Sequence, residues 1–479
     1  MKVTHTIIAL VILLGLGGVF YYLNKQPVQT SSSSETSKKK VFSFQADQVE
    51  EFTLETPNQP AATLRRVTPA AAPKPADSAK PAEPSQAQWE IVSPAGVVAD
   101  SAQVQSFLEE LPKLEDTPLD GAAPASLADF GLDQPKNVFR FKLKQGQTVA
   151  LSIGGENPSG SAKYGKLDSS PALFLLDSVD TKALEKTLFD LRDKRALPVV
   201  LDKAQRIELA FNFQDQKASP EEGQKADQSG KIVMTKLSNN NWELAEPSLR
   251  TDNGNTNYFV TVLTGALMKS VEEESPKSLS SYGLDRPAIR LTVKLPDSSA
   301  SLLVGSKKSG DDVAYYAKNS VWPQVFTINQ STYDQLKQDL DNYRNRYLFD
   351  FQTSGTRRVE ILGPAGELRL DKKGEGWVKA GAPEKKVDGA KVDAFLDSIH
   401  NLRIQQYAAD KPGQLAQYGL DKPWLRVKIT FGEKNQEETI LFARKDKRFY
   451  AARQGEPSVY EMAPGEPDNI EPKLKELSS

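Results

Sequence analysis

The chain has 479 residues, and its 61 basic and 63 acidic side chains leave a net charge of -2 at neutral pH. Nucleic-acid binding needs a large basic surface, so this balance predicts no nucleic-acid partner. Cysteine is absent and histidine occurs only at His5 and His400, which excludes disulfides and thiolate metal sites and leaves almost no material for a zinc site or a histidine-based triad. We therefore expect no metal ion and no cofactor.

The amino-terminal 25 residues are predicted to be a membrane anchor. Residues 7–23 are a run of 17 residues without a charged or strongly polar side chain, which is just long enough to cross a hydrocarbon core of about 30 Å. A cleaved signal peptide is the alternative, but no Ala-x-Ala-like cleavage site follows the run. Lysines stand on both sides of it, and we expect residues 26–40 to be a linker and the bulk of the chain to lie outside the cytoplasmic membrane.

A short motif, Gly-Leu-Asp-x-Pro, occurs three times, with its glycines 152 and 136 residues apart. A tryptophan recurs ahead of each copy at nearly the same intervals, 153 and 135 residues. This period is longer than the roughly 20–50 residues of solenoid repeats, so each unit is predicted to be a small domain. The recurring positions are Gly131, Leu132, Asp133 and Pro135; Gly283, Leu284, Asp285 and Pro287; Gly419, Leu420, Asp421 and Pro423; and Trp89, Trp242 and Trp377.

The chain after the linker is predicted to form three α+β repeats, at residues 41–200, 201–350 and 351–479. Each is expected to contain a three-stranded antiparallel meander, an amphipathic helix, the motif, a four-stranded antiparallel region and a closing helix. The meander strands are predicted at 49–55, 63–67 and 89–92; at 206–213, 231–237 and 242–244; and at 357–362, 367–370 and 377–379. The later strands are predicted at 138–143, 148–153, 162–166 and 173–176; at 289–295, 301–304, 313–317 and 325–328; and at 425–431, 438–442, 448–452 and 459–462.

The helices follow from apolar residues at helical spacing. The three central helices carry Val104, Phe107, Leu108 and Leu111; Phe259, Val262, Leu263, Ala266 and Leu267; and Val392, Phe395, Leu396 and Ile399. The closing helices are predicted at 181–192, 332–344 and 467–477. Residues 68–88 and 214–230 are polar or rich in proline and glycine, and we expect them to be surface loops.

The motif is interpreted as a structural turn. Glycine permits positive φ, leucine can anchor the turn in the core, aspartate can accept hydrogen bonds from nearby amides, and proline fixes φ before a strand. The alternative is that Asp133, Asp285 and Asp421 are catalytic carboxylates, but no second acidic residue recurs beside them. The three tryptophans are interpreted as core residues, with stacking on sugars as the alternative.

Basic residues cluster where two of the closing helices are predicted to end, at 192–195 and at 344–346. Cations at a helix carboxyl terminus interact favourably with the helix dipole, and this is the preferred interpretation. A patch for a partner protein is the alternative.

The motif, the strands after it, the aromatic residues Tyr164, Tyr315, Tyr316, Phe449 and Tyr450, and the Leu-Arg-Asp-Lys-Arg segment together resemble the DUF4340 family of tandem domains of unknown function. The resemblance covers nearly all of the chain after residue 40. It implies a membrane-anchored bacterial protein, often encoded with ABC-transporter permease and ATPase genes and a gliding-motility-type auxiliary component. It carries no catalytic residues. The third repeat departs from the pattern, because its last helix is short and lacks a basic end.

These observations together predict a non-enzymatic accessory or scaffold subunit of an ABC-type transport system, anchored in the bacterial cytoplasmic membrane by one segment. Its partners would be the membrane and the permease or auxiliary subunits. The alternative is an envelope module that binds glycan or peptidoglycan. An enzyme of the glycosidase type would require carboxylates of two repeats to converge within about 5–10 Å in one cleft.

Overall fold

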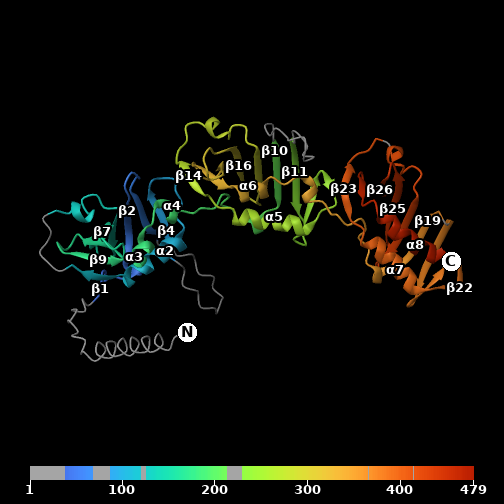
Figure 1. Ribbon diagram of the computed structural model, residues 1–479, viewed down its shortest axis with the longest axis horizontal. Helices are drawn as coiled ribbons and strands as arrows, with labels where there is room; N and C mark the ends of the chain where they lie inside the picture. The colour runs from blue at the N-terminus through green and yellow to red at the C-terminus, as the bar shows by residue number, and fades with distance from the viewer. Residues whose placement is uncertain are drawn as a thin grey trace, which may run out of the picture. The chain divides into compact units, whose positions relative to one another are not determined.

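The computed structural model describes residues 38–67, 87–119, 126–212, 229–364, 366–413 and 415–478. Within these residues the strands form three antiparallel sheets of nine strands each (Figure 1). The chain divides into two compact units, residues 1–194 with the first sheet and residues 195–479 with the other two. The first boundary lies ahead of the predicted residue 200 because Ala196 and Leu197 are buried and Ala196 bonds to Ala266 and Asn319.

The first sheet has the strand order β1-β5-β9-β8-β7-β6-β2-β3-β4. Its strands are β1 (Lys39–Lys40), β2 (Val49–Glu55), β3 (Ala62–Val67), β4 (Gln88–Ser93), β5 (Glu115–Pro118), β6 (Asn137–Leu143), β7 (Thr148–Glu156), β8 (Ala162–Leu167) and β9 (Leu173–Asp177). The helices of this repeat are α2 (Ser101–Glu110), α3 (Ser178–Leu184) and α4 (Leu188–Leu191).

The second and third sheets share one topology, with orders β13-β12-β11-β10-β15-β16-β17-β18-β14 and β22-β21-β20-β19-β24-β25-β26-β27-β23. The second contains β10 (Arg206–Asn212), β11 (Ser229–Lys236), β12 (Trp242–Glu246), β13 (Ser248–Leu249), β14 (Ser270–Glu273), β15 (Ile289–Lys294), β16 (Ser299–Lys307), β17 (Ala314–Asn319) and β18 (Val325–Asn329), with α5 (Asn253–Gly265) and α6 (Gln330–Leu336). The third contains β19 (Thr356–Gly363), β20 (Gly366–Lys373), β21 (Gly376–Lys379), β22 (Ala382–Val387), β23 (Ile404–Ala409), β24 (Leu425–Phe431), β25 (Gln436–Lys445), β26 (Arg448–Arg453) and β27 (Val459–Met462), with α7 (Gly389–His400) and α8 (Glu466–Ser478).

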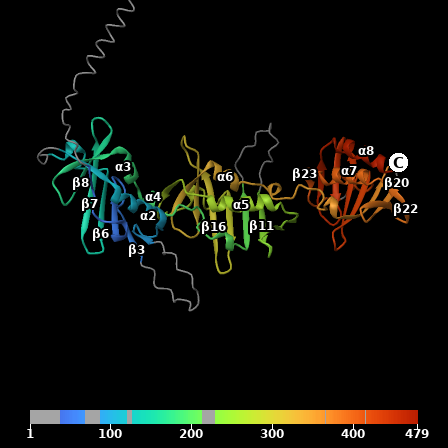
Figure 2. The same ribbon diagram turned by 90° about the horizontal axis from the view of Figure 1, so that it is seen from below.

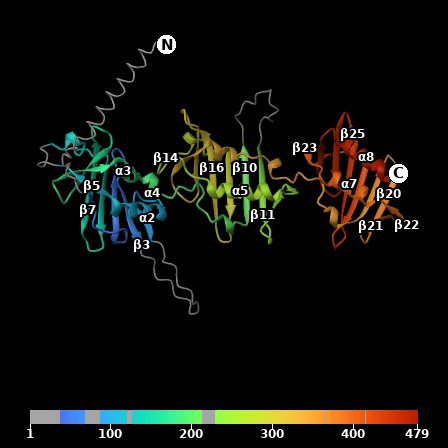
Figure 3. The ribbon, with the colours of Figure 1, turned by 60° about the horizontal axis from the view of Figure 1, so that its bottom comes forward.

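The meander and the later strands of each repeat form one continuous sheet, which the sequence analysis did not predict. The joins are the antiparallel pairs β2 with β6, β10 with β15 and β19 with β24. These strands alternate buried and exposed residues in register, so pairing them gives the helices a single apolar face to cover. Figure 2 and Figure 3 show the helices on one face of their sheets, with α5 lying across the strands of the second.

Three further predictions differ from the structure. A strand after each central helix, β5, β14 or β23, was missed because its residues are mostly half-buried or exposed and do not alternate clearly. Strand β1 lies in the segment predicted to be linker, where it pairs with β5. The closing helices of the first two repeats also differ: α3 and α4 replace the single helix predicted at 181–192, and α6 ends at Leu336 where the prediction ran to 344.

Each central helix begins at an aspartate that repeats with the motif. Asp100, Asp252 and Asp388 are the N-caps of α2, α5 and α7, and each side chain accepts a hydrogen bond from an amide of the first turn. The predicted apolar stripes of α2 and α7 are buried. In the second repeat Leu267 is 51% exposed, because α5 ends at Gly265 and the residue falls outside the helical face.

The predicted anchor at residues 7–23 and both predicted loops lie largely or wholly outside the described residues. In the part of the chain that the structure describes, no helix is both long and apolar enough to cross a membrane.

Glu208 should make folding of the second sheet sensitive to acid. Hydrogen bonds from Lys294 and Arg206, at 2.9 and 2.8 Å, lower its pKa to about 2. Because this folded value lies below the unfolded value of 4.5, the stabilisation is present above about pH 4.5 and is lost as the pH falls towards 2. The site is partly exposed, so we expect a contribution of at most about 1 kcal/mol.

Denaturant unfolding of Glu208→Gln at pH 7 and pH 3 measures this effect. The variant should be less stable than wild type at pH 7 and should approach it at pH 3. Glu243→Gln, at an exposed residue of β12, is the matched control and should leave the pH dependence unchanged. Equal loss of stability by Glu208→Gln at both pH values would contradict the assignment.

Candidate functional site

The motif residues lie in three equivalent turns, one in each repeat. Gly131, Gly283 and Gly419 have φ of 65°, 67° and 72°, and each ends a short 3-10 helix. In the first turn the Gly131 amide bonds to the Ala128 carbonyl and the Leu132 amide to the Leu127 carbonyl, at 3.0 Å each. These two bonds define a Schellman motif, which explains why glycine is followed by a leucine anchored in the core.

The remaining motif residues support a structural role for the turn. Leu132, Leu284 and Leu420 are buried, and the prolines are half-buried where each turn enters a strand. The aromatic residue before each glycine packs edge-to-face on a tyrosine of the same sheet, in the pairs Phe130 with Tyr164, Tyr282 with Tyr316 and Tyr418 with Tyr450. The three turns therefore pack on their sheets in the same way.

The aspartates of the motif do not have the role predicted for them. Asp133, Asp285 and Asp421 are exposed, and within the described residues none of them accepts a hydrogen bond from a neighbouring amide. The turn closes through backbone groups alone, so the carboxylate is not needed to hold it. None of the three aspartates lines either of the two cavities described below.

The recurring tryptophans lie in the core of each repeat. Trp89, Trp242 and Trp377 are 5%, 3% and 2% exposed. The Trp89 ring lies 5.7 Å from that of Phe52 and 4.7 Å from the Arg66 guanidinium. Its face is thus occupied from within the protein, and no sugar ring can stack on it.

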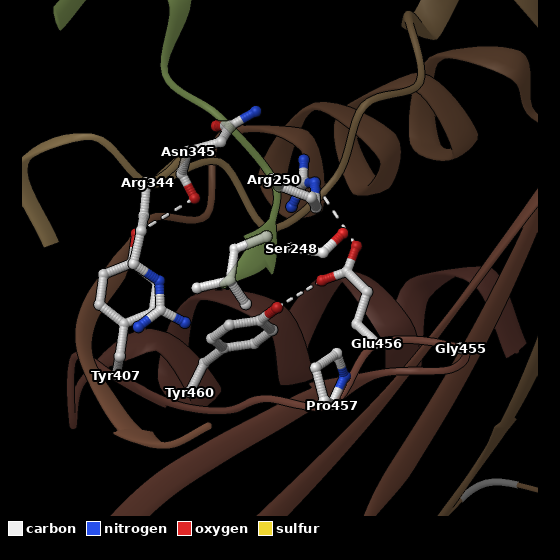
Figure 4. A pocket seen from close by; sticks show the side chains of 10 residues that line it. Ser248, Arg250, Arg344, Asn345, Tyr407, Gly455, Glu456, Pro457 and Tyr460 are labelled. Carbon is white, nitrogen blue, oxygen red and sulfur yellow. Dashed lines mark hydrogen bonds and ion pairs between the residues drawn. The ribbon is translucent and has the colours of Figure 1, made fainter. Parts of the chain in front are cut away.

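The most elaborate polar site in the described residues is the joint between the second and third repeats, within the unit 195–479. Two segments of the second repeat form its base, since Thr251 and Arg344 make an isolated β-bridge and the Asn345 amide bonds to the Arg250 carbonyl at 2.9 Å. This pairing places Arg250 and Arg344 next to each other, facing the third repeat (Figure 4).

Arg344 is buried and binds residues of both repeats. One terminal nitrogen donates to Asp410 at 2.6 Å and to Ser458 at 3.1 Å, and the other donates to Asp341 at 3.2 Å. The guanidinium carbon lies 3.4 Å from the centre of the Tyr407 ring. A planar, permanently charged group suits this combination of carboxylate pairing and ring stacking.

A second arginine of the joint, Arg250, is linked to Arg453 of the third repeat through shared carboxylates. Arg250 donates to Asp350 and lies 3.6 Å from Glu456, while Arg453 lies 3.0 Å from each of the same two carboxylates. The buried Glu438 accepts a hydrogen bond from the Asp350 amide and lies 3.4 Å from Arg453. Burial raises the pKa of Glu438, and the nearby Arg453 opposes that shift.

A cavity of about 300 Å³ lies at the joint, lined by Ser248, Leu249, Arg250, Arg344, Asn345, Tyr407, Gly455, Glu456, Pro457 and Tyr460. The Tyr407 hydroxyl donates to the Asn345 carbonyl at 3.2 Å, and the Tyr460 hydroxyl donates to Glu456. Burial raises the pKa of Tyr407 to about 12, so this phenol stays neutral. The arginines of the cavity are already paired with carboxylates, which suits a joint between domains better than a site for an anionic ligand.

Carboxylates of the second and third repeats meet on Arg344 at this joint, but neither of them lines the cavity, so the condition for glycosidase chemistry is not met. Asp341 belongs to the second repeat and Asp410 to the third, but Arg344 pairs with both. Glu438 has the raised pKa that a general acid needs, yet its side chain is only 2% exposed and therefore closed to a substrate. In the described residues no cluster of side chains is suited to hold a metal ion.

Both interpretations of the basic segment 344–346 were wrong for Arg344. It does not end a helix, since α6 ends at Leu336, and it is not an exposed patch, since it is 3% exposed. The sequence contained one usable signal: Arg192 and Arg344 recur at the 152-residue interval of the glycines, and both are buried. Nothing in the sequence pointed to Arg250, Asp410, Glu438 or Glu456.

A family model described as a domain of unknown function, DUF4340, matches residues 89–248, 242–412 and 377–477. The chain belongs to the DUF4340 family. The resemblance inferred from the motif is thereby confirmed, as are the tandem repeats. Each DUF4340 match begins at a recurring tryptophan, and the first two matches extend past the tryptophan of the next repeat. The sheet of each repeat begins before its tryptophan, so the matched segments and the sheets have different boundaries. Neither the curated proteins nor the solved structures contain a significant match.

Proposed function

We propose that this DUF4340 protein is a non-enzymatic accessory or scaffold subunit of an ABC-type transport system, anchored in the bacterial cytoplasmic membrane with most of its chain outside. The observation that carries the proposal is the joint between the second and third repeats. Its buried and partly buried ion pairs hold two domains together and pair both arginines of the cavity with carboxylates. A scaffold needs such fixed spacing between its domains.

The family setting supports the same function. The resemblance to the DUF4340 family implies a gene that is often encoded beside ABC-transporter permease and ATPase genes. Three tandem domains on one membrane anchor would suit a subunit that contacts several partners. Binding of glycan through the recurring tryptophans is disfavoured, because Trp89, Trp242 and Trp377 are buried and Tyr315 is only 8% exposed.

Affinity purification from detergent-solubilised membranes tests the proposal. The full chain, tagged at its carboxyl terminus and expressed in its native host, should enrich an ABC permease and ATPase over a tagged, unrelated single-pass protein. Recovery of the chain without any transporter component would contradict the proposed function. Protease treatment of intact spheroplasts, followed by mapping of cleavage within residues 68–88, tests the orientation separately, and cleavage without lysis is expected.

A further inference from the structure

A second cavity, of about 690 Å³, lies in the second repeat at the end of the sheet where the motif turn enters β15. Its charged lining residues are Arg286, Arg290 and Lys307, which come from the turn, from β15 and from β16. Among the described residues no acidic side chain lines the cavity, and Asp285, the neighbour of Arg286, is outside the lining. A volume of this size is typical of ligand pockets, which span roughly 300–1,000 Å³.

These three cations differ from the other basic residues nearby, which are paired. Lys308 binds Glu272, and Lys231, which lies opposite Ala210 on β11, binds Glu246. Arg286, Arg290 and Lys307 are exposed, and within the described residues none of them has a carboxylate within 4.0 Å or a side-chain hydrogen bond. Three cations without a carboxylate partner among the described residues give the cavity a positive potential.

The inner wall of the cavity is rigid and partly aromatic. The rings of Tyr315 and Tyr333 are stacked in parallel with their centres 3.6 Å apart, and the Tyr315 hydroxyl donates to Gln330 at 3.1 Å. Ser306 donates to the carbonyl of Tyr282 at 3.1 Å, which ties β16 to the turn. The three cations therefore lie on two strands and on a turn that a hydrogen bond joins to β16.

Comparison with the first repeat shows that the fold does not require these charges, while the third repeat has Lys422 and Arg426 at the positions of Arg286 and Arg290. Three and seven residues after the motif glycine, the first repeat has Gln134 and Val138 where the second has Arg286 and Arg290. The bulged position of Lys307 is occupied by Glu156 in the first repeat, since both follow the same register shift. An equivalent turn thus forms without them, and the cations of the second repeat call for another explanation.

We propose that this cavity binds an anionic ligand with two or more phosphate or carboxylate groups. Arginine presents paired N–H donors that match either group, and three cations on separate elements suit a ligand with more than one anionic centre. This inference is independent of the transporter assignment, because it rests on the second repeat alone.

Isothermal titration calorimetry on the full chain in detergent tests the proposal, with pyrophosphate and citrate as the phosphate and carboxylate probes at low salt. At least one probe should bind with a dissociation constant below about 1 mM. The triple variant Arg286→Gln, Arg290→Gln and Lys307→Gln should weaken binding by at least about tenfold, since each charge-assisted hydrogen bond contributes strongly. All three residues are exposed, so the variant should keep the circular dichroism and melting temperature of wild type.

The matched control is Lys203→Gln, Lys385→Gln and Lys386→Gln, which removes three exposed positive charges elsewhere in the same unit that have no carboxylate partner among the described residues. It should bind as wild type does. The proposal would be overturned if neither probe bound, or if the cavity variant bound as wild type does. It would also be overturned if the control variant weakened binding equally, because the probes would then be attracted by net charge alone.

Discussion

Replacement of Arg344 by methionine is expected to lower the free energy of unfolding of the unit 195–479 by about 2–4 kcal/mol. Methionine fills much of the volume but loses the bonds to Asp410, Ser458 and Asp341 and the stacking on Tyr407. Asp341 and Asp410 are partly exposed, so water can hydrate their carboxylates when the guanidinium is removed. The loss of stability is therefore smaller than for a fully buried charge left without a partner.

Guanidinium chloride unfolding measures this change, and a double-mutant cycle assigns it. Asp410→Ala leaves the buried Arg344 without its shortest partner, so Arg344→Met combined with Asp410→Ala should cost less than the sum of the two single changes. Arg346→Met, at an exposed residue of the same segment, is the control and should change stability by less than about 0.5 kcal/mol. Additive costs in the cycle would show that the pair does not hold the joint.

Replacement of Gly305 by alanine is expected to cost about 3 kcal/mol, because the new methyl group overpacks a site bounded by backbone. A Cβ at Gly305 would lie 2.2 Å from the carbonyl oxygen of Tyr282 and 3.0 Å from the carbonyl carbon of Gly283. Both atoms belong to the Schellman turn and neither can move without breaking it. Gly154 of the first repeat is restricted in the same way by Phe130.

Thermal unfolding measures the effect, and a loss of about 3 kcal/mol corresponds to a fall in the melting temperature of roughly 6–12 °C. Gly265→Ala is the control, since nothing lies within 4 Å of its added Cβ, and it should be neutral or slightly stabilising. The third repeat has Ala443 next to its motif glycine, where β25 and β26 pair without a register shift. If Gly305→Ala had the melting temperature of wild type, the close approach of the Tyr282 and Gly283 backbone would not explain the glycine at residue 305.

The sequence predicted those features that depend on neighbouring residues. The turn, the apolar stripe of α7 and the strands around Trp377 follow from local patterns, and the structure contains all of them. The apolar leucine of each turn is buried as its pattern required. The aspartate of the motif was misread, because its recurrence suggested a hydrogen-bonding role that backbone groups perform.

Features that depend on distant residues were not predicted. Arg344 and Asp410 are 66 positions apart, and nothing in either local pattern distinguishes a buried ion pair from two solvated side chains. The pairing of β10 with β15 was missed for the same reason, since each strand alone is compatible with a separate sheet. The cavity around Arg286 depends on a bulge in β16, which sequence spacing does not reveal.

The join at the middle of each sheet sets the order of events during synthesis. Because β10 ends at Asn212 and its partner β15 begins at Ile289, a long intervening stretch must leave the ribosome before β10 of the second repeat gains its second neighbouring strand. Until then one edge of the meander and its apolar face stay open to other nascent chains. Each repeat passes through this stage in turn, so an open strand edge arises three times in succession as the chain is made.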